Sequence, residues 1–294
     1  MQIGIDLGGT KTEAIALDAH RPVAARRRVP SPRDYAGTLD TIARLVAEIE
    51  GETGRTGTVG VGIPGALSHD TGLVKNANST WLIGRPLQAD LESRLARPVR
   101  LANDANCFTL SEAMDGAGQG CETVFGVILG TGVGGGIAMR QRIHDGPNRV
   151  AGEWGHNPLP WMTEEERVSA APCYCGKVGC VETFLSGPGF ERSHGRSSRE
   201  AVREAAAGEP HAIQSLRRYQ DQLARALAAV INVLDPDAIV LGGGMSNLPD
   251  LAPAAAARLP RYVFSDTVVT RVLPNVHGDS SGVRGAAWLW PHGG

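Results

Sequence analysis

Residues 3–12 of this chain read Ile3-Gly4-Ile5-Asp6-Leu7-Gly8-Gly9-Thr10-Lys11-Thr12. An apolar run leads into a double-glycine turn, and a second apolar run from Ala14 to Leu17 follows, which is typical of a β-hairpin. Glycine in the turn lets backbone N–H groups approach a ligand closely, and successive N–H groups form a concave anion site. The stretch therefore predicts either a cradle for a triphosphate or a plain tight hairpin that carries one acid.

The polar residues of this turn suit the first of these alternatives. Thr10 and Lys11 add a hydroxyl group and an ammonium group beside the glycines. Asp6 would lie at the mouth of the turn, where a carboxylate can hold Mg²⁺ or its water shell.

Composition excludes several classes of protein. The chain has 294 residues, of which 42% are hydrophobic and 20% charged, enough for two domains with proper cores. Its net charge of −2 provides no basic field for nucleic acid or for an anionic membrane. No apolar run approaches the roughly 20 residues of a membrane span, and no secretory signal opens the chain. We therefore expect a cytoplasmic protein with no nucleic-acid or membrane partner.

Residues 123–139 repeat the opening pattern, with a run of glycines at 130–136 between two apolar runs. The two stretches match at an offset of 122 residues, which is too long for a solenoid and predicts a duplicated domain. The matched pairs are Gly4 and Gly126, Leu7 and Leu129, Gly8 and Gly130, Ile15 and Ile137, and Ala16 and Ala138. Ile128 takes the position of Asp6, so only the first turn offers a carboxylate.

Two other nucleotide motifs fit less well. Gly130, Gly132 and Gly135 satisfy the dinucleotide fingerprint, but that fingerprint requires a helix directly after the glycines. Here a strand pattern follows and Gly146-Pro147 ends it, which disfavours a dinucleotide site. A P-loop is excluded because the chain contains no Gly-x4-Gly-Lys-Ser/Thr.

A cluster of metal-ligating residue types lies further along the chain. The predicted ligands are His156, Cys173, Cys175 and Cys180. Three thiols and an imidazole complete a tetrahedral zinc shell, and a shell of four protein ligands is typical of structural zinc. The alternative is a chance cluster of buried thiols. Cys107 and Cys121 have no partner nearby in the sequence and are expected to be small core residues.

Asp104 stands at a corner between a predicted strand, Val99–Leu101, and a predicted helix that runs to about Met114. Phosphoryl transfer needs a phosphate cradle, a metal and a base for the acceptor hydroxyl. Asp104 is the candidate base, because Asn103 and Asn106 beside it can orient a sugar without adding charge. The alternative is that Asp104 only caps the helix, a role that Asp fills well.

Five motifs, in order along essentially the whole chain, together resemble the ROK family of sugar kinases. They are Asp6-Leu7-Gly8-Gly9-Thr10-Lys11, Asn103-Asp104-Ala105-Asn106, Gly130-Thr131-Gly132-Val133-Gly134-Gly135-Gly136, Gly152-Glu153-Trp154-Gly155-His156 and Cys173-x-Cys175-Gly176-x-x-Gly179-Cys180-x-Glu182. The zinc motif is specific to that family, whereas the glycine turns are shared with the wider actin-like ATPase superfamily. Residues 75–81 and 151–161 look most like the bacterial fructokinase (manno(fructo)kinase) branch.

The resemblance implies an α/β fold of two actin-like (ribonuclease H-like) domains around a central cleft, with a structural zinc site. The expected domains are residues 1–117 plus 280–294, and residues 118–279 with the zinc motif. Asp104 would take the proton from the 6-hydroxyl of D-fructose as that oxygen attacks the γ-phosphate of Mg²⁺-bound ATP. Glucose, mannose or an N-acetylated hexose are alternative acceptors, and a homodimer is the expected assembly.

The resemblance also implies the binding residues. The expected sugar-binding residues are Gly65, Asn78, Asn103, Asp104, Glu153, His156 and Glu182. The expected ATP-binding residues are Gly4, Asp6, Gly8, Gly9, Thr10, Lys11, Gly130, Thr131, Gly132, Gly134, Gly243 and Gly244. His156 would bind the sugar and the zinc ion together, so that the metal would orient a substrate-binding residue.

Three rival functions remain open. A sugar-sensing regulator of the same family is disfavoured because its repressor members carry an N-terminal helix-turn-helix, whereas this chain begins at the phosphate strand. An actin- or chaperone-like ATPase without a small acceptor is disfavoured by the complete set of sugar-binding residues. A zinc module for nucleic acid is least expected, since a basic, aromatic surround is missing.

Overall fold

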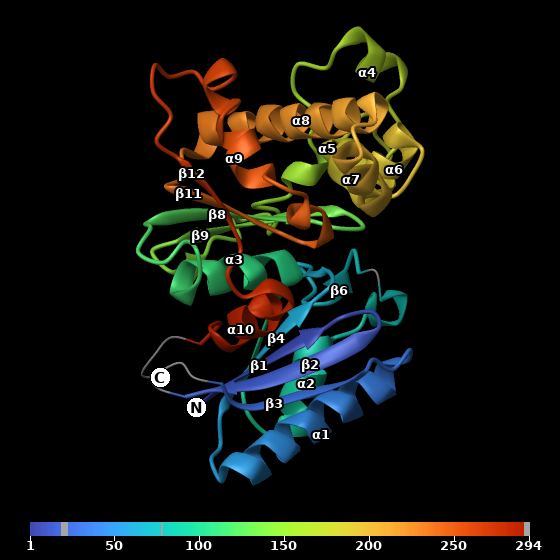
Figure 1. Ribbon diagram of the computed structural model, residues 1–294. Helices are drawn as coiled ribbons and strands as arrows, with labels where there is room; N and C mark the ends of the chain where they lie inside the picture. Colours follow the sequence, from blue (N-terminus) through green and yellow to red (C-terminus); the bar gives the residue numbers. More distant parts are fainter. Residues whose placement is uncertain (19–22, 78, 291–294) are drawn as a thin grey trace.

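The computed structural model describes residues 1–18, 23–77 and 79–290 of the chain. Asn78, an expected sugar-binding residue, lies outside the described residues, as do the last four residues of the expected first domain. Two mixed β-sheets, one in each half of the molecule, form the frame of an α/β fold (Figure 1). The α/β class expected from the sequence is confirmed.

The first sheet has the strand order β3-β2-β1-β4-β7. Its strands are β1 (Gln2–Leu7), β2 (Lys11–Leu17), β3 (Val23–Pro30), β4 (Thr58–Ile63) and β7 (Val99–Asn103). β1 and β2 form the antiparallel hairpin predicted from residues 3–17, and β4 lies parallel to β1 on its other side. A separate two-stranded sheet pairs β5 (Ala66–Leu67) with β6 (Val74–Lys75).

The second sheet repeats this arrangement in the order β10-β9-β8-β11-β12. Its strands are β8 (Thr123–Leu129), β9 (Val133–Met139), β10 (Arg142–Ile143), β11 (Ala238–Gly242) and β12 (Arg271–Pro274). β8 and β9 form the second predicted hairpin, and β11 lies parallel to β8 as β4 does to β1. The repeat seen in the sequence is therefore a repeat of a hairpin with a parallel neighbour.

Amphipathic helices cover the outer faces of the sheets (Figure 1). On the first sheet these are α1 (Tyr35–Thr53) and α2 (Leu87–Leu95). On the second half they are α5 (Val181–Leu185), α6 (Gly187–His194), α7 (Ser198–Ala206), α8 (Pro210–Leu234) and α9 (Leu251–Ala256), while α4 (Glu164–Val168) lies farther from the sheet than α8. The 3-10 helices are η1 (Thr80–Leu82), η2 (Trp154–His156), η3 (Gly244–Asn247), η4 (Leu259–Arg261) and η5 (Gly278–Ser280).

Helix α1 shows why these segments are helical. Asp34 caps its start by accepting a hydrogen bond from the backbone N–H of Gly37, and Gly54 ends it with a φ of 64°. Its apolar residues at helical spacing, Ile42, Leu45, Val46 and Ile49, are buried in the core of the first half. None of the helices in the described part of the chain combines the length and the apolar composition needed to cross a membrane.

Two helices lie between the sheets, α3 (Asp104–Asp115) and α10 (Ser281–Ala287) (Figure 1). α3 follows a strand of the first sheet yet packs on β8 and β9 of the second, and α10 follows the second sheet yet packs on β1 and β4 of the first. The two helices also pack against each other. Each half thus lends one helix to the other, and the expected domain limits stay a prediction.

Glycines in the duplicated strands make this exchange possible. A Cβ atom on Gly4 would lie 2.1 Å from the carbonyl oxygen of Val283 in α10. A Cβ atom on the matching Gly126 would lie 2.0 Å from the hydroxyl oxygen of Thr109 in α3. Distances this short are forbidden by van der Waals contact, so both strands need glycine where a helix crosses them.

Candidate active site

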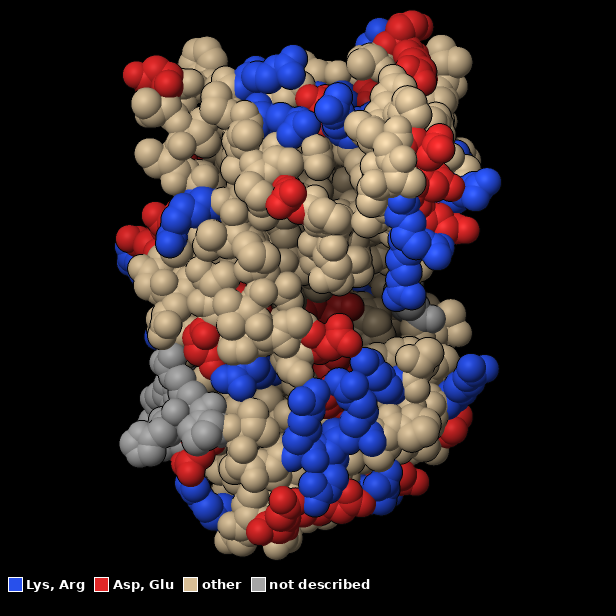
Figure 2. Space-filling view, viewed as in Figure 1, with Lys and Arg blue, Asp and Glu red and all other residues tan. Residues whose placement is uncertain are grey.

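A cavity of about 160 Å³ lies between the two halves, at the carboxyl ends of β4 and β7. In Figure 2 the surface is hollowed at the waist of the molecule, and acidic side chains lie in the hollow. The cavity is lined by Ile63, Ala66, Leu67, Gln88, Leu101, Ala102, Asn103, Asn106, Gly135, Asp145, Arg149, Ala151 and Glu153. Both sheets therefore contribute to its wall, which is the usual place for a ligand in an α/β fold.

Asp104 is the first residue of α3, between Asn103 and Asn106, which both line the cavity. Asn103 is the cap of the helix: its side-chain oxygen accepts a hydrogen bond of 2.9 Å from the backbone N–H of Ala105. The Asn103 amide also donates to the carbonyl oxygen of Gly65, at 3.2 Å. The helix cap is therefore Asn103, and Asp104 does not fill the capping role that was its alternative.

Burial raises the pKa of Asp104 to about 6, although its carboxylate accepts a hydrogen bond from the backbone N–H of Ala105. The nearby carboxylate of Glu153 adds to the increase. A carboxyl group with a pKa this close to neutrality is well matched to the transfer of a proton from a hydroxyl group.

Asp6 lies at the end of β1, close enough to Asp104 for their charges to interact. Burial raises the pKa of Asp6 to about 7, and the carboxylates of Asp104 and Glu13 add to the increase. A bound cation would favour the ionised form of such a carboxyl group. Asp6 is therefore suited to hold a cation, and Asp104 is suited to accept a proton.

The first glycine turn joins β1 to β2 and is stabilised by its own backbone. The N–H of Gly8 donates to the carbonyl oxygen of Lys11 at 3.1 Å, and Gly9 and Thr10 are exposed at the tip. The Lys11 ammonium lies 3.6 Å from the carboxylate of Asp279. Gly4 lies further back in the strand, where the packing of α10 accounts for the glycine.

The second glycine turn joins β8 to β9, and Thr131 is exposed at its tip. Glu182 from α5 reaches this turn and accepts a hydrogen bond of 3.0 Å from the N–H of Val133. A Cβ atom on Gly132 would lie 2.7 Å from the same carboxylate, and one on Gly134 would lie 3.3 Å from Ala105 in α3.

The glycines that end β11 lie beside the second turn. β11 and β8 are parallel neighbours, and Gly242 pairs with Ile128. Gly243 has a φ of 84°, and a Cβ atom there would lie 2.4 Å from the carbonyl oxygen of Leu129. Gly244 begins η3 with open space around it. The expected ATP-binding residues of the second half thus lie together at the carboxyl ends of β8 and β11.

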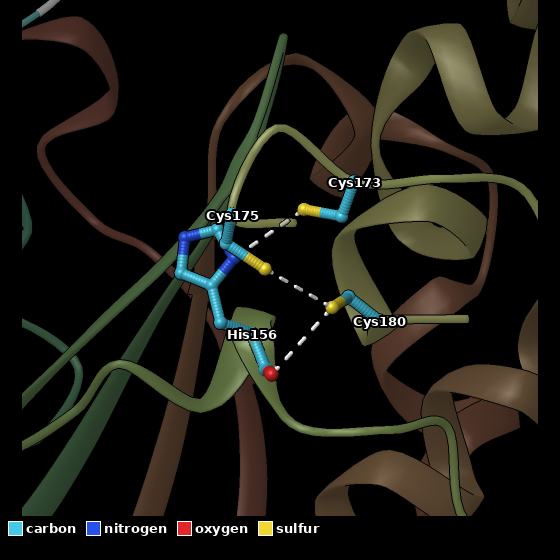
Figure 3. A group of neighbouring side chains, drawn as sticks. All are labelled: His156, Cys173, Cys175 and Cys180. Carbon is cyan, nitrogen blue, oxygen red and sulfur yellow. Dashed lines mark hydrogen bonds between the residues drawn. The ribbon is translucent and has the colours of Figure 1, made fainter. Parts of the chain in front are cut away.

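The four predicted zinc ligands come together beside this turn. Figure 3 shows the ring of His156 and the sulfur atoms of Cys173, Cys175 and Cys180 pointing toward one another. Their ligand atoms all lie within 4.8 Å of one another. Nδ1 of His156 lies 3.6 Å from the Cys173 sulfur, and the sulfurs of Cys175 and Cys180 are 3.6 Å apart.

This spacing fits zinc, whose tetrahedral ligands at about 2.0–2.3 Å from the ion lie roughly 3.5–3.8 Å from one another. The other ring nitrogen of His156 is 3.0 Å from the hydroxyl of Tyr174, which fixes the ring. The Cys173 sulfur also lies 3.7 Å from the carboxylate of Glu182, so the cluster adjoins the second glycine turn. The residues present can hold the ion.

The structure divides the expected sugar-binding residues into two groups. Asn103 and Glu153 line the cavity, and Asp104 and Gly65 adjoin Asn103. His156 and Glu182 lie at the thiol cluster instead, outside the cavity lining.

Gln88, Asp145 and Arg149 line the cavity but were not predicted from the sequence. Their residue types form no motif, and only the fold brings them to the site. Asp145 and Arg149 do precede Glu153 closely in the chain, which was the one available signal.

The chain is similar to known kinases over almost its whole length. It is 40% identical to an N-acetyl-D-glucosamine kinase of Vibrio parahaemolyticus, over 98% of this chain and 99% of the relative. It is also 40% identical to an N-acetyl-D-glucosamine kinase of Yersinia pseudotuberculosis, over 98% of both chains. These relatives overturn the expectation that D-fructose is the acceptor, which rested on the likeness of two short stretches to the fructokinase branch.

Solved structures share the fold. The ROK hexokinase of Thermus thermophilus matches with a TM-score of 0.86 and 30% identity, covering 98% of this chain and 97% of that one. A ROK family glucokinase of Streptomyces griseus, solved with glucose and AMPPNP, matches with a TM-score of 0.77 and 28% identity over 97% of both chains. The model of the ROK family matches residues 2–292, and the chain therefore belongs to the ROK family.

Proposed function

We propose that this protein is an ATP-dependent kinase that phosphorylates the 6-hydroxyl group of N-acetyl-D-glucosamine. The observation that carries the proposal is the position of Asp104, a half-buried residue whose carboxyl group has a pKa raised to about 6, beside a cavity lined by both halves. Support for the acceptor comes from the 40% identical relatives, which are N-acetyl-D-glucosamine kinases. Support for the donor comes from the glucokinase solved with AMPPNP.

In the proposed reaction, the Asp104 carboxylate accepts the proton of the sugar hydroxyl as that oxygen attacks the γ-phosphorus of ATP. The bond from the γ-phosphorus to the bridging oxygen breaks, and ADP leaves. Backbone N–H groups of the two glycine turns bind the phosphates, and Gly243 and Gly244 lie against the adenosine. Asp6 would hold Mg²⁺, which supplies positive charge to the phosphate oxygens. Closure of the two halves excludes water, which would otherwise accept the phosphoryl group.

The thiol cluster is proposed to bind one structural zinc ion through His156, Cys173, Cys175 and Cys180. Its contacts support a positioning role: Glu182 touches both Cys173 and the second glycine turn. The proposed ion would hold His156 and Glu182 in place, and both are proposed to bind sugar hydroxyls with Asn103 and Glu153. His156 would do so through the ring nitrogen that contacts the Tyr174 hydroxyl in this structure. The homodimer implied by the family resemblance and the cytoplasmic location expected from the sequence features stay predictions.

The test is an ADP-release assay with Mg-ATP and a panel of acceptors. The panel contains N-acetyl-D-glucosamine, N-acetyl-D-mannosamine, glucose, mannose, fructose and a blank without sugar. We expect the highest kcat/KM for N-acetyl-D-glucosamine, and no ADP above the blank with its 6-deoxy analogue. A higher kcat/KM for a sugar without an acetamido group would overturn the acceptor, and release equal to the blank for every sugar would overturn the kinase.

A further inference from the structure

The loop before Glu153 forms the rim of the cavity on the side of the second half. Residues 145–151 form a compact turn, in which the N–H of Ala151 donates to the carbonyl oxygen of Asp145 at 3.2 Å. The Asp145 carboxylate accepts a hydrogen bond of 3.0 Å from the Asn106 amide, so α3 anchors the loop. The rim is thus fixed to the same helix that begins at Asp104.

Arg149 occupies an uncommon backbone conformation in this turn. Its φ is 53°, in the left-handed region that favours glycine, and its N–H donates to the carbonyl oxygen of Gly146 at 3.2 Å. Its side chain lines the cavity and is exposed. Arg140 adopts the same conformation outside the cavity, so the conformation assigns no role to the side chain, but it allows glycine to replace Arg149 without a change of backbone.

The hydrogen-bond donors of the cavity wall single out this arginine. Gln88, Asn103 and Asn106 are neutral donors, and each already donates at least one of its two amide N–H groups to another group of the protein. The guanidinium of Arg149 makes no hydrogen bond or ion pair with any residue that the structure describes. It is also the only Lys or Arg among the described residues of the wall. The cavity therefore holds one uncommitted cationic donor.

An N-acetylated acceptor offers a group that such a donor can bind. Sugar hydroxyl groups can donate to the carboxylates of the wall, such as Glu153, but the carbonyl oxygen of an acetamido group can only accept. Arginine carries five N–H donors and no acceptor. We propose that Arg149 binds the acetamido carbonyl of the acceptor and so selects N-acetylated hexoses over hexoses with a free 2-hydroxyl. This inference rests on the proposed function and names the residue that determines its specificity.

The test uses Arg149→Gly, because glycine keeps the left-handed backbone while removing the guanidinium. We expect the KM for N-acetyl-D-glucosamine to rise roughly tenfold or more, the loss typical of a hydrogen bond to a charged group. The KM for ATP should stay unchanged, and so should the KM for glucose, which has no carbonyl group in the ring form. Thermal unfolding of the variant should match that of the wild type.

Arg140→Gly is the matched control. Arg140 is also an exposed arginine with a positive φ, of 50°, but it pairs with Glu122 and lies outside the cavity. The same substitution there should leave both sugar constants at their wild-type values. This control measures any general effect of replacing an arginine that has a positive φ with glycine.

The outcomes separate this inference from the proposed function. If the wild type phosphorylates N-acetyl-D-glucosamine and Arg149→Gly has the same KM, the inference is overturned and the proposed function stands. If the wild type transfers no phosphate, titration calorimetry with N-acetyl-D-glucosamine replaces the kinetic readout. Weaker binding by Arg149→Gly than by Arg140→Gly would then support the inference, and equal binding or none would overturn it.

Discussion

The two glycine turns have the same backbone frame but receive their acids from different places. In the first turn, the acid is part of the hairpin itself, because Asp6 lies in β1. In the second turn, Ile128 occupies the matching position of β8, and the acid, Glu182, comes from helix α5. Glu182 is bonded to the turn through the N–H of Val133.

This difference shows that the duplicated halves share their backbone arrangement but not their acidic residues. The hairpin, its parallel neighbour and the glycine under the crossing helix occur in both halves. The acids do not: Asp6 lies close to Asp104, whereas Glu182 lies beside the thiol of Cys173. The first turn therefore depends on burial to tune its carboxyl groups, and the second depends on the proposed metal cluster to place one.

The largest expected effect comes from removing the acid beside the first turn. Asp104→Asn should lower kcat by about 10²- to 10⁴-fold, because an amide cannot accept the hydroxyl proton. Binding of the acceptor, measured by titration calorimetry, should be retained.

Asp115→Asn is the control for this substitution, since Asp115 lies at the other end of α3 and pairs with His277 and Arg284. It should lower thermal stability and leave kcat unchanged. A kcat for Asp104→Asn within tenfold of the wild type would show that the first half does not supply the base.

A smaller effect is expected from breaking the cluster beside the second turn. Cys175→Ser should lose bound zinc, measured by elemental analysis, and raise the KM for the sugar by about tenfold, because His156 and Glu182 would lose their support. Cys121→Ser alters a buried thiol outside the cluster and should keep both values. Loss of zinc with an unchanged KM would mean that the second turn holds its acid without the metal.

The smallest expected effect is a shift in the pH profile. Because the pKa of Asp104 is raised to about 6, kcat should fall as the pH drops below 6 and the carboxylate becomes protonated. Glu153→Gln removes a nearby negative charge, so the pKa of Asp104 should decrease and the acid limb should move to lower pH by less than about one unit. Glu122→Gln changes an exposed acid that pairs with Arg140 and does not line the cavity, so it should not move the limb. If the acid limb of the pH profile is the same in Glu153→Gln as in the wild type, the carboxylate of Glu153 does not raise the pKa of Asp104.

Local patterns made much of the fold predictable. Both hairpins follow from apolar runs around glycines, and the thiol cluster follows from three cysteines within eight residues. The helix start at Asn103-Asp104 was predictable as a corner, but the sequence offered Asp104 as its cap, whereas the structure has Asn103 there. Only the backbone decides between them, because Asn103 has the extended φ and ψ of −61° and 149° that a cap requires.

What the sequence determined by itself was therefore the local chemistry: two glycine hairpins, a candidate base between asparagines and a set of zinc-type ligands. The tertiary structure decided that α3 crosses to the second sheet, that burial raises the pKa of Asp104, and that Arg149 and Asp145 reach the cavity. These features depend on contacts between residues far apart in the chain. The choice of acceptor also depends on the tertiary structure, because one or two contacts in the cavity decide between similar sugars. A motif that positions a catalytic base does not determine those contacts.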